Sequence, residues 1–283
     1  MVLEYIIGPR GAEKKPWQMI FIGALYVVVA FFIASWIFPE NIDLVTVFLC
    51  TFASIPVIYD AVRLEEREDI EEKDEINVLM QHGRALNFFI CLFIGFMLGF
   101  TILYCVLPAA TVQNAFITQI KTINAVNGNA TSELSRQFGA FITIFVNNFK
   151  VMLFCLLFSF VYGMGAIFIL AWNASIIGVA MGSFIRLNLQ HYTEVMKMAG
   201  PAAYFKAYGL GLLRYSIHGI PEMAAYFVAG LAGSIISIAV IRHDMGTKNF
   251  EKIILDSSDL ILIALAILLL AALVEVFVTP LFF

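Results

Sequence analysis

Long apolar runs separated by short polar stretches dominate the sequence. Continuous apolar segments cover residues 17–38, 44–59, 85–107, 215–241 and 260–278. Most of them approach or exceed the roughly 20 residues that a helix needs to cross a hydrocarbon layer. Because a helix satisfies its backbone hydrogen bonds within a single lipid-facing segment, this pattern predicts an all-α, polytopic transmembrane helical bundle.

The apolar region after residue 138 is too long for one helix of ordinary span. No charged residue occurs from 151 to 185, and a single helix of that length would extend about 50 Å, against a hydrocarbon core of about 30 Å. The sequence therefore predicts one broken or re-entrant segment near 163–185. Residues 172–184 form either a thin extra span or a piece that enters and leaves on one side, so six or seven crossings remain open. The possible break points are Gly163, Gly165, Asn173, Gly178 and Gly182.

Composition identifies the solvent as lipid. The chain is 61% hydrophobic and 13% charged, with a mean hydropathy of +0.90, whereas soluble domains are about 45–50% apolar and about 25% charged. These values exclude a soluble enzyme, a nucleic-acid-binding protein and a disordered chain. We therefore expect the protein to lie in a lipid bilayer and to bind no nucleic acid.

Catalytic and metal-binding signatures are missing from the sequence. It contains no HExxH, GxSxG, GxxxxGK[ST] or GxGxxG motif. The 4 cysteines lie in apolar segments without CxxC spacing, which is typical of packing residues. We therefore expect a protein that is not an enzyme and that holds no cofactor and no metal.

Charge is unevenly distributed along the chain. Nine acidic residues but only three bases lie between Asp60 and Glu75. This run is expected to be a solvated helical face between two spans, or a docking surface for a basic partner. Bases flank the first three apolar runs on the same side and are scarce in the polar stretch 108–136. The positive-inside rule then predicts a multi-pass protein of the cell membrane with a cytoplasmic N-terminus and a cytoplasmic acidic connector.

A few polar and ionisable residues lie within or beside the apolar segments. An ionised side chain at mid-bilayer costs roughly 2.5–3.5 kcal/mol on insertion scales, so these residues are expected to form a buried cluster or to line a water path. The candidates for this intramembrane polar cluster are Asn147, Asn148, Asn173, His218, Glu222 and Glu275, with Lys150 beside the paired asparagines.

Glu222 has three open interpretations, one of which is an interfacial position with no special task. His218 and Glu222 are four residues apart and share one face of a continuous helix, while Gly219 and Pro221 indicate a helix that starts near Pro221. The pair can form a proton or cation site together with asparagine carbonyls. Alternatively, Glu222 forms an interhelical clamp by hydrogen-bonding an asparagine, Asn147 or Asn148. For Glu275, which is close to the last residue of the sequence, an interfacial position with its carboxylate in water is also open.

Small residues mark further positions of helix breaks or close packing. Stripes such as Gly178-x-x-x-Gly182 allow helix backbones to approach each other. The positions expected to break or to pack closely are Gly163, Gly165, Gly178, Gly182, Gly219, Pro221, Gly230 and Gly233.

Four segments together resemble one family. FVNNFKVM (145–152), GMGAIFILAWNASIIGVAMG (163–182), HGIPEMAAYFVAGLAG (218–233) and LVEVFVTP (273–280) resemble the stage II sporulation protein M family of integral membrane proteins. The resemblance rests on the paired asparagines, a glycine-flanked asparagine, an HGxxE stretch and a terminal acid followed by Thr-Pro.

This resemblance implies a division of the chain and a role. It covers roughly residues 85–283, so residues 1–84 are expected to be an additional N-terminal transmembrane hairpin with its acidic connector. The resemblance implies a membrane anchor in an envelope-remodelling complex with wall-degrading partners.

Two functions from different classes follow. The first is a non-catalytic scaffold or anchor for an envelope-associated complex, with protein partners or as a homo-oligomer. The second is a permease for a small solute, an ion or a proton, with its polar intramembrane site around Glu222.

Overall fold

The computed structural model is a bundle of long helices. It describes residues 16–71, 75–126, 133–162, 166–194, 201–241 and 248–281, which are helical apart from short turns and contain no strand. The elements are α3 (Gln18–Ile37), α4 (Ile42–Glu71), α5 (Glu75–Val106), α6 (Ala109–Ala115), α7 (Ile117–Val126), α8 (Glu133–Tyr162), α9 (Ala166–Glu194), α10 (Pro201–Ile241), α11 (Lys248–Leu273), the π-helix η1 (Val274–Val278) and the 3₁₀-helix η2 (Thr279–Leu281).

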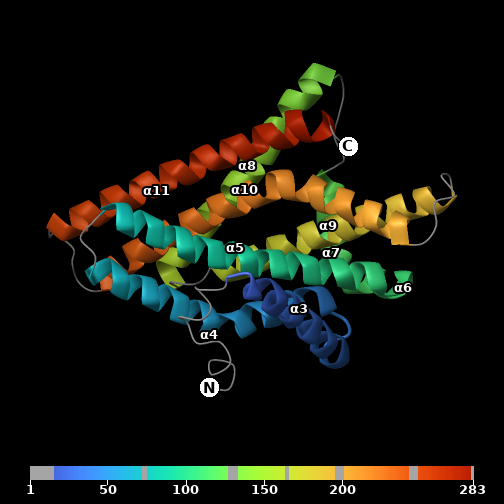
Figure 1. The fold of residues 1–283 in the computed structure, drawn as a ribbon, viewed down its shortest axis with the longest axis horizontal. Coiled ribbons are helices and arrows are strands. Elements are labelled where there is room, and N and C mark those ends of the chain that lie inside the picture. Colours follow the sequence, from blue (N-terminus) through green and yellow to red (C-terminus); the bar gives the residue numbers. More distant parts are fainter. Residues whose placement is uncertain are drawn as a thin grey trace.

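The predicted membrane bundle is confirmed. Within the described residues, six helices are long and apolar enough to cross a membrane, namely α3, α5, α8, α9, α10 and α11. In α4 the apolar part is shorter and covers Ile42–Ile58. Figure 1 shows the α3–α4 pair on one side of α5 and the α10–α11 pair on the other.

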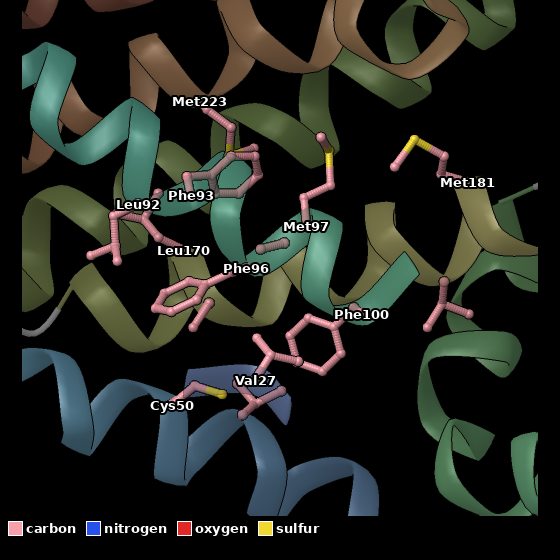
Figure 2. Close-up of a cluster of buried hydrophobic side chains, with 14 of the residues drawn as sticks. Val27, Cys50, Leu92, Phe93, Phe96, Met97, Phe100, Leu170, Met181 and Met223 are labelled. Carbon is pink, nitrogen blue, oxygen red and sulfur yellow. The ribbon is translucent and has the colours of Figure 1, made fainter. Parts of the chain in front are cut away.

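The core is built around α5. Phe93, Phe96, Met97 and Phe100 of this helix are buried, and Figure 2 shows them between side chains of the flanking helices. The flanking side chains include Val27 of α3, Cys50 of α4, Leu170 of α9 and Met223 of α10, all buried. Helix α5 therefore joins the N-terminal hairpin to the rest of the bundle.

Glycines allow α3 and α5 to touch through their backbones. A methyl group at Gly23 would lie 2.7 Å from the carbonyl oxygen of Leu92, and one at Gly99 would lie 2.8 Å from Cβ of Val27. A methyl group at Gly95 would overlap the carbonyl oxygen of Ile20. Because only glycine fits at such a crossing, the hairpin is packed directly on α5.

Asp43 joins the start of α4 to α7. Its Oδ1 accepts a hydrogen bond from the backbone N–H of Leu44 (2.8 Å). Its Oδ2 accepts from the backbone N–H of Thr118 (3.2 Å) and from the hydroxyl of the same residue. An acid in the first turn also suits the helix dipole, so one buried carboxylate fixes the relative position of two helix starts.

Residue pairs between helices give the direction of each helix. Helices α3 and α5 run parallel, since Gly23 faces Gly95 and Val27 faces Gly99. Helices α5 and α9 also run parallel, since the hydroxyl of Thr101 donates to the carbonyl of Gly178 (3.1 Å) and the next contact pairs Cys105 with Gly182.

Helix α10 runs in the opposite direction to α9. Gly211 lies against Ile185, whereas Gly219, further along α10, lies against the earlier residue Ile177. Two neighbouring parallel helices require the chain between them to return, and α4 is the returning segment between α3 and α5. This alternation favours seven crossings, of which α4 is the shortest.

The predicted interruption of the apolar region near 163–185 is present at its start, where one helix ends and the next begins, whereas the predicted break points within 172–184 are wrong. Helix α9 is continuous from Ala166 to Glu194, so Asn173, Gly178 and Gly182 do not interrupt it, and residues 172–184 are neither a separate thin span nor a re-entrant piece. The long apolar stretch instead belongs to two helices, because α8 ends at Tyr162 and α9 starts at Ala166. Gly163 and Gly165 lie outside the described residues.

The predicted helix start at Pro221 is also wrong. Helix α10 contains Pro221 in its interior and continues through Gly219 without interruption. Neighbouring helices can tolerate a proline in a membrane helix, because their side chains and local adjustments satisfy the freed backbone groups. His218 and Glu222 therefore lie on one uninterrupted helix.

Candidate functional site

Three polar side chains from three elements meet inside the bundle. The amide Nδ2 of Asn148 on α8 donates a hydrogen bond to Oε1 of Glu222 on α10. The carboxyl group of Glu275 on η1 lies beside that of Glu222, close enough for the two groups to interact. Asn148 is 8% exposed and Glu222 is 6% exposed, while Glu275 is half-buried. These three residues are the polar cluster discussed below.

Close contact between α8 and α10 positions Asn148 and Glu222. A methyl group at Gly233 of α10 would overlap the carbonyl oxygen of Leu156 on α8 and would lie 3.2 Å from the backbone nitrogen of Phe160. The two helices run parallel, so this contact continues back to Asn148 and Glu222, about two to three turns earlier on each helix. The glycine contact thus brings an amide and a carboxyl group within hydrogen-bonding distance.

A change of helix type positions Glu275. Helix α11 ends at Leu273 and widens into the π-helix Val274–Val278, which contains Glu275. The hydroxyl of Thr279 donates to the carbonyl of Val274 (3.2 Å) across this wide turn, and Pro280 has no N–H with which to continue a regular helix. Single π-turns are frequent at functional sites, and this one carries the second carboxyl group of the cluster.

The cluster lies at mid-depth in the helix bundle. Gly219, one turn before Glu222, lies against Ile177 near the middle of α9. Two carboxyl groups can hydrogen-bond each other only when one of them carries a proton. The cluster can therefore hold a proton between two acids, or clamp α8, α10 and the end of α11 to one another.

The other predicted members of the cluster lie elsewhere. Asn147 is exposed, on a different face of α8 from Asn148. Asn173 donates its amide to the carbonyl of Ile169 in its own helix (2.9 Å). His218 lies one turn before Glu222, and its ring is T-shaped against Tyr215, at 6.2 Å between centroids. Its Nδ1 is buried without a hydrogen-bond partner among the described residues.

The predicted small-residue positions differ in how tightly they pack. Methyl groups at Gly178 and Gly182 would each lie 2.7 Å from atoms of α5. At Gly230 the nearest atom is the hydroxyl of Ser159, at 3.3 Å, and at Gly219 it is Ile177, at 3.7 Å, which is an ordinary contact. Close approach is therefore strongest at Gly178 and Gly182, and at Gly233 described above.

Sequence reasoning missed several polar contacts between helices. Gln119 of α7 is fully buried and donates to the hydroxyl of Ser175 on α9 (3.2 Å). Arg186 donates to the carbonyls of Cys105 and Leu107 at the end of α5 and lies over the Tyr104 ring, 5.3 Å from its centroid. No local sequence pattern predicts these contacts, because each one joins residues more than 50 positions apart.

The glycine crossing of α3 and α5 was also missed, although the sequence carries a signal for it. Gly95 and Gly99 form a small-x-x-x-small stripe in the apolar run 85–107.

The described residues contain no group of three His, Cys, Asp or Glu side chains placed to hold a metal ion.

Comparison with known families decides the relationship. The family model described as stage II sporulation protein M matches residues 88–280. The chain belongs to this family. The predicted resemblance is therefore confirmed, and the matched range, from α5 to η2, includes all three residues of the polar cluster. No curated protein and no solved structure matches the chain.

Family membership indicates a membrane protein but names no reaction, substrate or partner. The stage II sporulation protein M family is one of membrane proteins and is not known as a family of enzymes. The match starts within α5, so α3 and α4 precede it.

Proposed function

We propose that this protein is a non-catalytic scaffold in the cell membrane that anchors an envelope-associated complex. The observation that carries the proposal is the pairing within the polar cluster. Glu222 accepts a hydrogen bond from Asn148 and lies beside the carboxyl group of Glu275, and none of the atoms of these three residues is among the buried polar atoms that lack a partner. Polar groups satisfied in this way act as interhelical ties, which is what a rigid anchor requires.

The division of the chain supports an anchoring role. Residues 85–283 form the family domain in this proposal, and residues 1–84 add a hairpin whose second helix, α4, continues beyond its apolar part into the acidic run. The bases around the first three spans favour a cytoplasmic N-terminus. A cytoplasmic acidic helix is then available to basic partners.

Purification from the native membrane tests the scaffold. The full chain, extracted in mild detergent, is expected to co-elute with at least one other protein in a fixed ratio, measured by quantitative mass spectrometry of the complex. A second membrane protein of the same host, tagged and expressed at the same level, is the control for adventitious association. A chain that elutes alone in several mild detergents and in lipid nanodiscs contradicts the proposal.

One observation favours a second candidate, a proton or ion permease. The buried Nδ1 of His218 has no partner among the described residues, and His218 lies one turn from Glu222, whose carboxyl group lies beside that of Glu275. Ionisable groups at membrane depth are typical of proton relays and ion pathways.

Reconstitution separates the two functions. If the chain is a permease, vesicles that contain it should conduct protons or cations, and Glu222→Gln should abolish the flux while leaving the fold intact. The scaffold proposal instead expects no flux above that of empty vesicles for either form. Flux is measured with an entrapped pH dye under an imposed potential, and the thermal midpoint of each variant controls for folding.

A further inference from the structure

Helix α8 presents a cation on its outward side. In the candidate span Gln137–Val161, Lys150 is the sole charged residue, and its side chain is exposed. At 1.5 Å per residue it lies about 20 Å from the start of this span and about 16 Å from its end. The four-carbon stem of a lysine is too short to reach either interface from there.

The side of α8 that carries Lys150 is opposite the polar cluster. Lys150 and Asn148 are two residues apart, which places them about 200° apart around the helix. Helical spacing puts the following residues on the same side as Lys150, and all are exposed: Gly139, Thr143, Val146, Leu153 and Leu157. We call these six residues the outer face of α8.

Helix α8, which carries the outer face, is the least buried of the six candidate spans. In the candidate span of α8, 11% of the residues are buried, whereas the other five spans range from 28% to 61%. In Figure 1 the N-terminal end of α8 projects past the end of α11. In the part of the chain that the structure describes, no atom lies within 4 Å of a methyl group built at Gly139. Gly139 and Thr143 have the small-x-x-x-small spacing that lets another helix approach closely.

A lone ammonium group in hydrocarbon costs roughly 2.5–3.5 kcal/mol on insertion scales. Among the described residues, no acidic side chain forms an ion pair with Lys150. A carboxylate from another molecule at the same depth would remove this cost, because opposite charges attract strongly where water is excluded.

We propose that the outer face of α8 docks a transmembrane helix of a different protein, one that carries an Asp or Glu at its middle. This inference rests on the proposed scaffold function and specifies its partner. A second copy of the chain fits less well. In a two-fold dimer through this face the same patch meets itself, so Lys150 would meet Lys150 at the same depth, and like charges oppose association.

Site-specific photo-crosslinking in native membranes tests the proposal. A photoreactive amino acid is placed at Thr143 on the outer face and, as a matched control, at the exposed apolar Leu269 of α11. Thr143 is expected to crosslink to a transmembrane peptide of another protein that has an acidic residue near its middle, identified by mass spectrometry. Leu269 is expected to give no such adduct.

Charge variants then test the role of the ammonium group. The adduct yield from Thr143 is expected to fall about tenfold or more in Lys150→Glu, because a like charge now faces the partner, and also to fall in Lys150→Met. The yield should remain in Lys150→Arg. Lys150→Met removes a charge from lipid, so it is expected to insert and fold, as checked by monodisperse elution.

Three results overturn the inference. They are an unchanged adduct yield in Lys150→Glu and Lys150→Met, a crosslinked peptide that derives from this chain itself, and adducts with lipid alone. If Lys150→Glu still co-purifies with its partners, this inference fails and the scaffold function stands. If the unaltered chain has no partner, both fail.

Discussion

Gly233→Leu is expected to prevent the formation of the stable bundle. The new side chain would start on top of the carbonyl oxygen of Leu156 and 3.2 Å from the backbone nitrogen of Phe160. Neither backbone group can rotate away, so α8 and α10 must separate, and the Asn148–Glu222 hydrogen bond is lost with their contact. A destabilisation of about 3 kcal/mol or more is expected, at or above the upper end of ordinary overpacking. The measurement is the thermal midpoint in detergent, together with the monodisperse fraction on size exclusion.

Gly209 provides a control in the same helix. A methyl group there has no atom of the described residues within 4 Å, so Gly209→Ala is expected to leave stability unchanged or to raise it by about 0.5–1 kcal/mol, the helix-propensity gain of alanine over glycine. Equal losses in Gly233→Leu and Gly209→Ala would mean that the α8–α10 contact is not as close as described.

Glu222→Leu is expected to produce the largest loss among single changes in the polar cluster. It leaves the buried amide of Asn148 without its hydrogen-bond partner, and an unpaired buried polar group costs about 1–3 kcal/mol. A double-mutant cycle with Asn148→Leu is expected to give a coupling energy of about 0.6–1.7 kcal/mol, between the average and the largest value measured for interhelical hydrogen bonds in a membrane protein. Reversible unfolding in mixed micelles provides the free energies.

The neighbouring asparagine is the control for this cycle. Asn147 is exposed and lies on another face of α8, so Asn147→Leu is expected to change the free energy of unfolding by less than about 0.5 kcal/mol. A coupling energy between Asn147 and Glu222 equal to that of Asn148 would show that α8 is rotated from the orientation described here.

The helical, membrane-spanning character of the chain and its family could be predicted from the sequence, since both depend on patterns that lie along the chain. Apolar runs of span length require helices whatever their neighbours are, and the motifs around Asn148, Glu222 and Glu275 were sufficient to suggest the family. The rotation of each helix could not be predicted. Asn147 and Asn148 differ by about 100° around α8, and only packing against α10 determines which of them faces inward.

Local geometry was the second feature that sequence reasoning could not supply. From the sequence, Gly178 and Gly182 are equally consistent with a helix break and with a close helix contact. In the structure they form a close contact, because α5 lies directly against them. The π-helix around Glu275 is only five residues long, too short to produce a periodic pattern in the sequence. It places the carboxyl group of Glu275 beside that of Glu222, whereas the sequence also allowed an interfacial position for Glu275.

The length of α4 has a mechanical consequence. Its apolar part ends at Ile58, yet the helix continues to Glu71, which adds about 20 Å beyond the apolar layer at 1.5 Å per residue. A helix resists bending, whereas a coil absorbs displacement. A pull on the acidic end of α4 would therefore be passed along the extension to the apolar part of the helix instead of being absorbed.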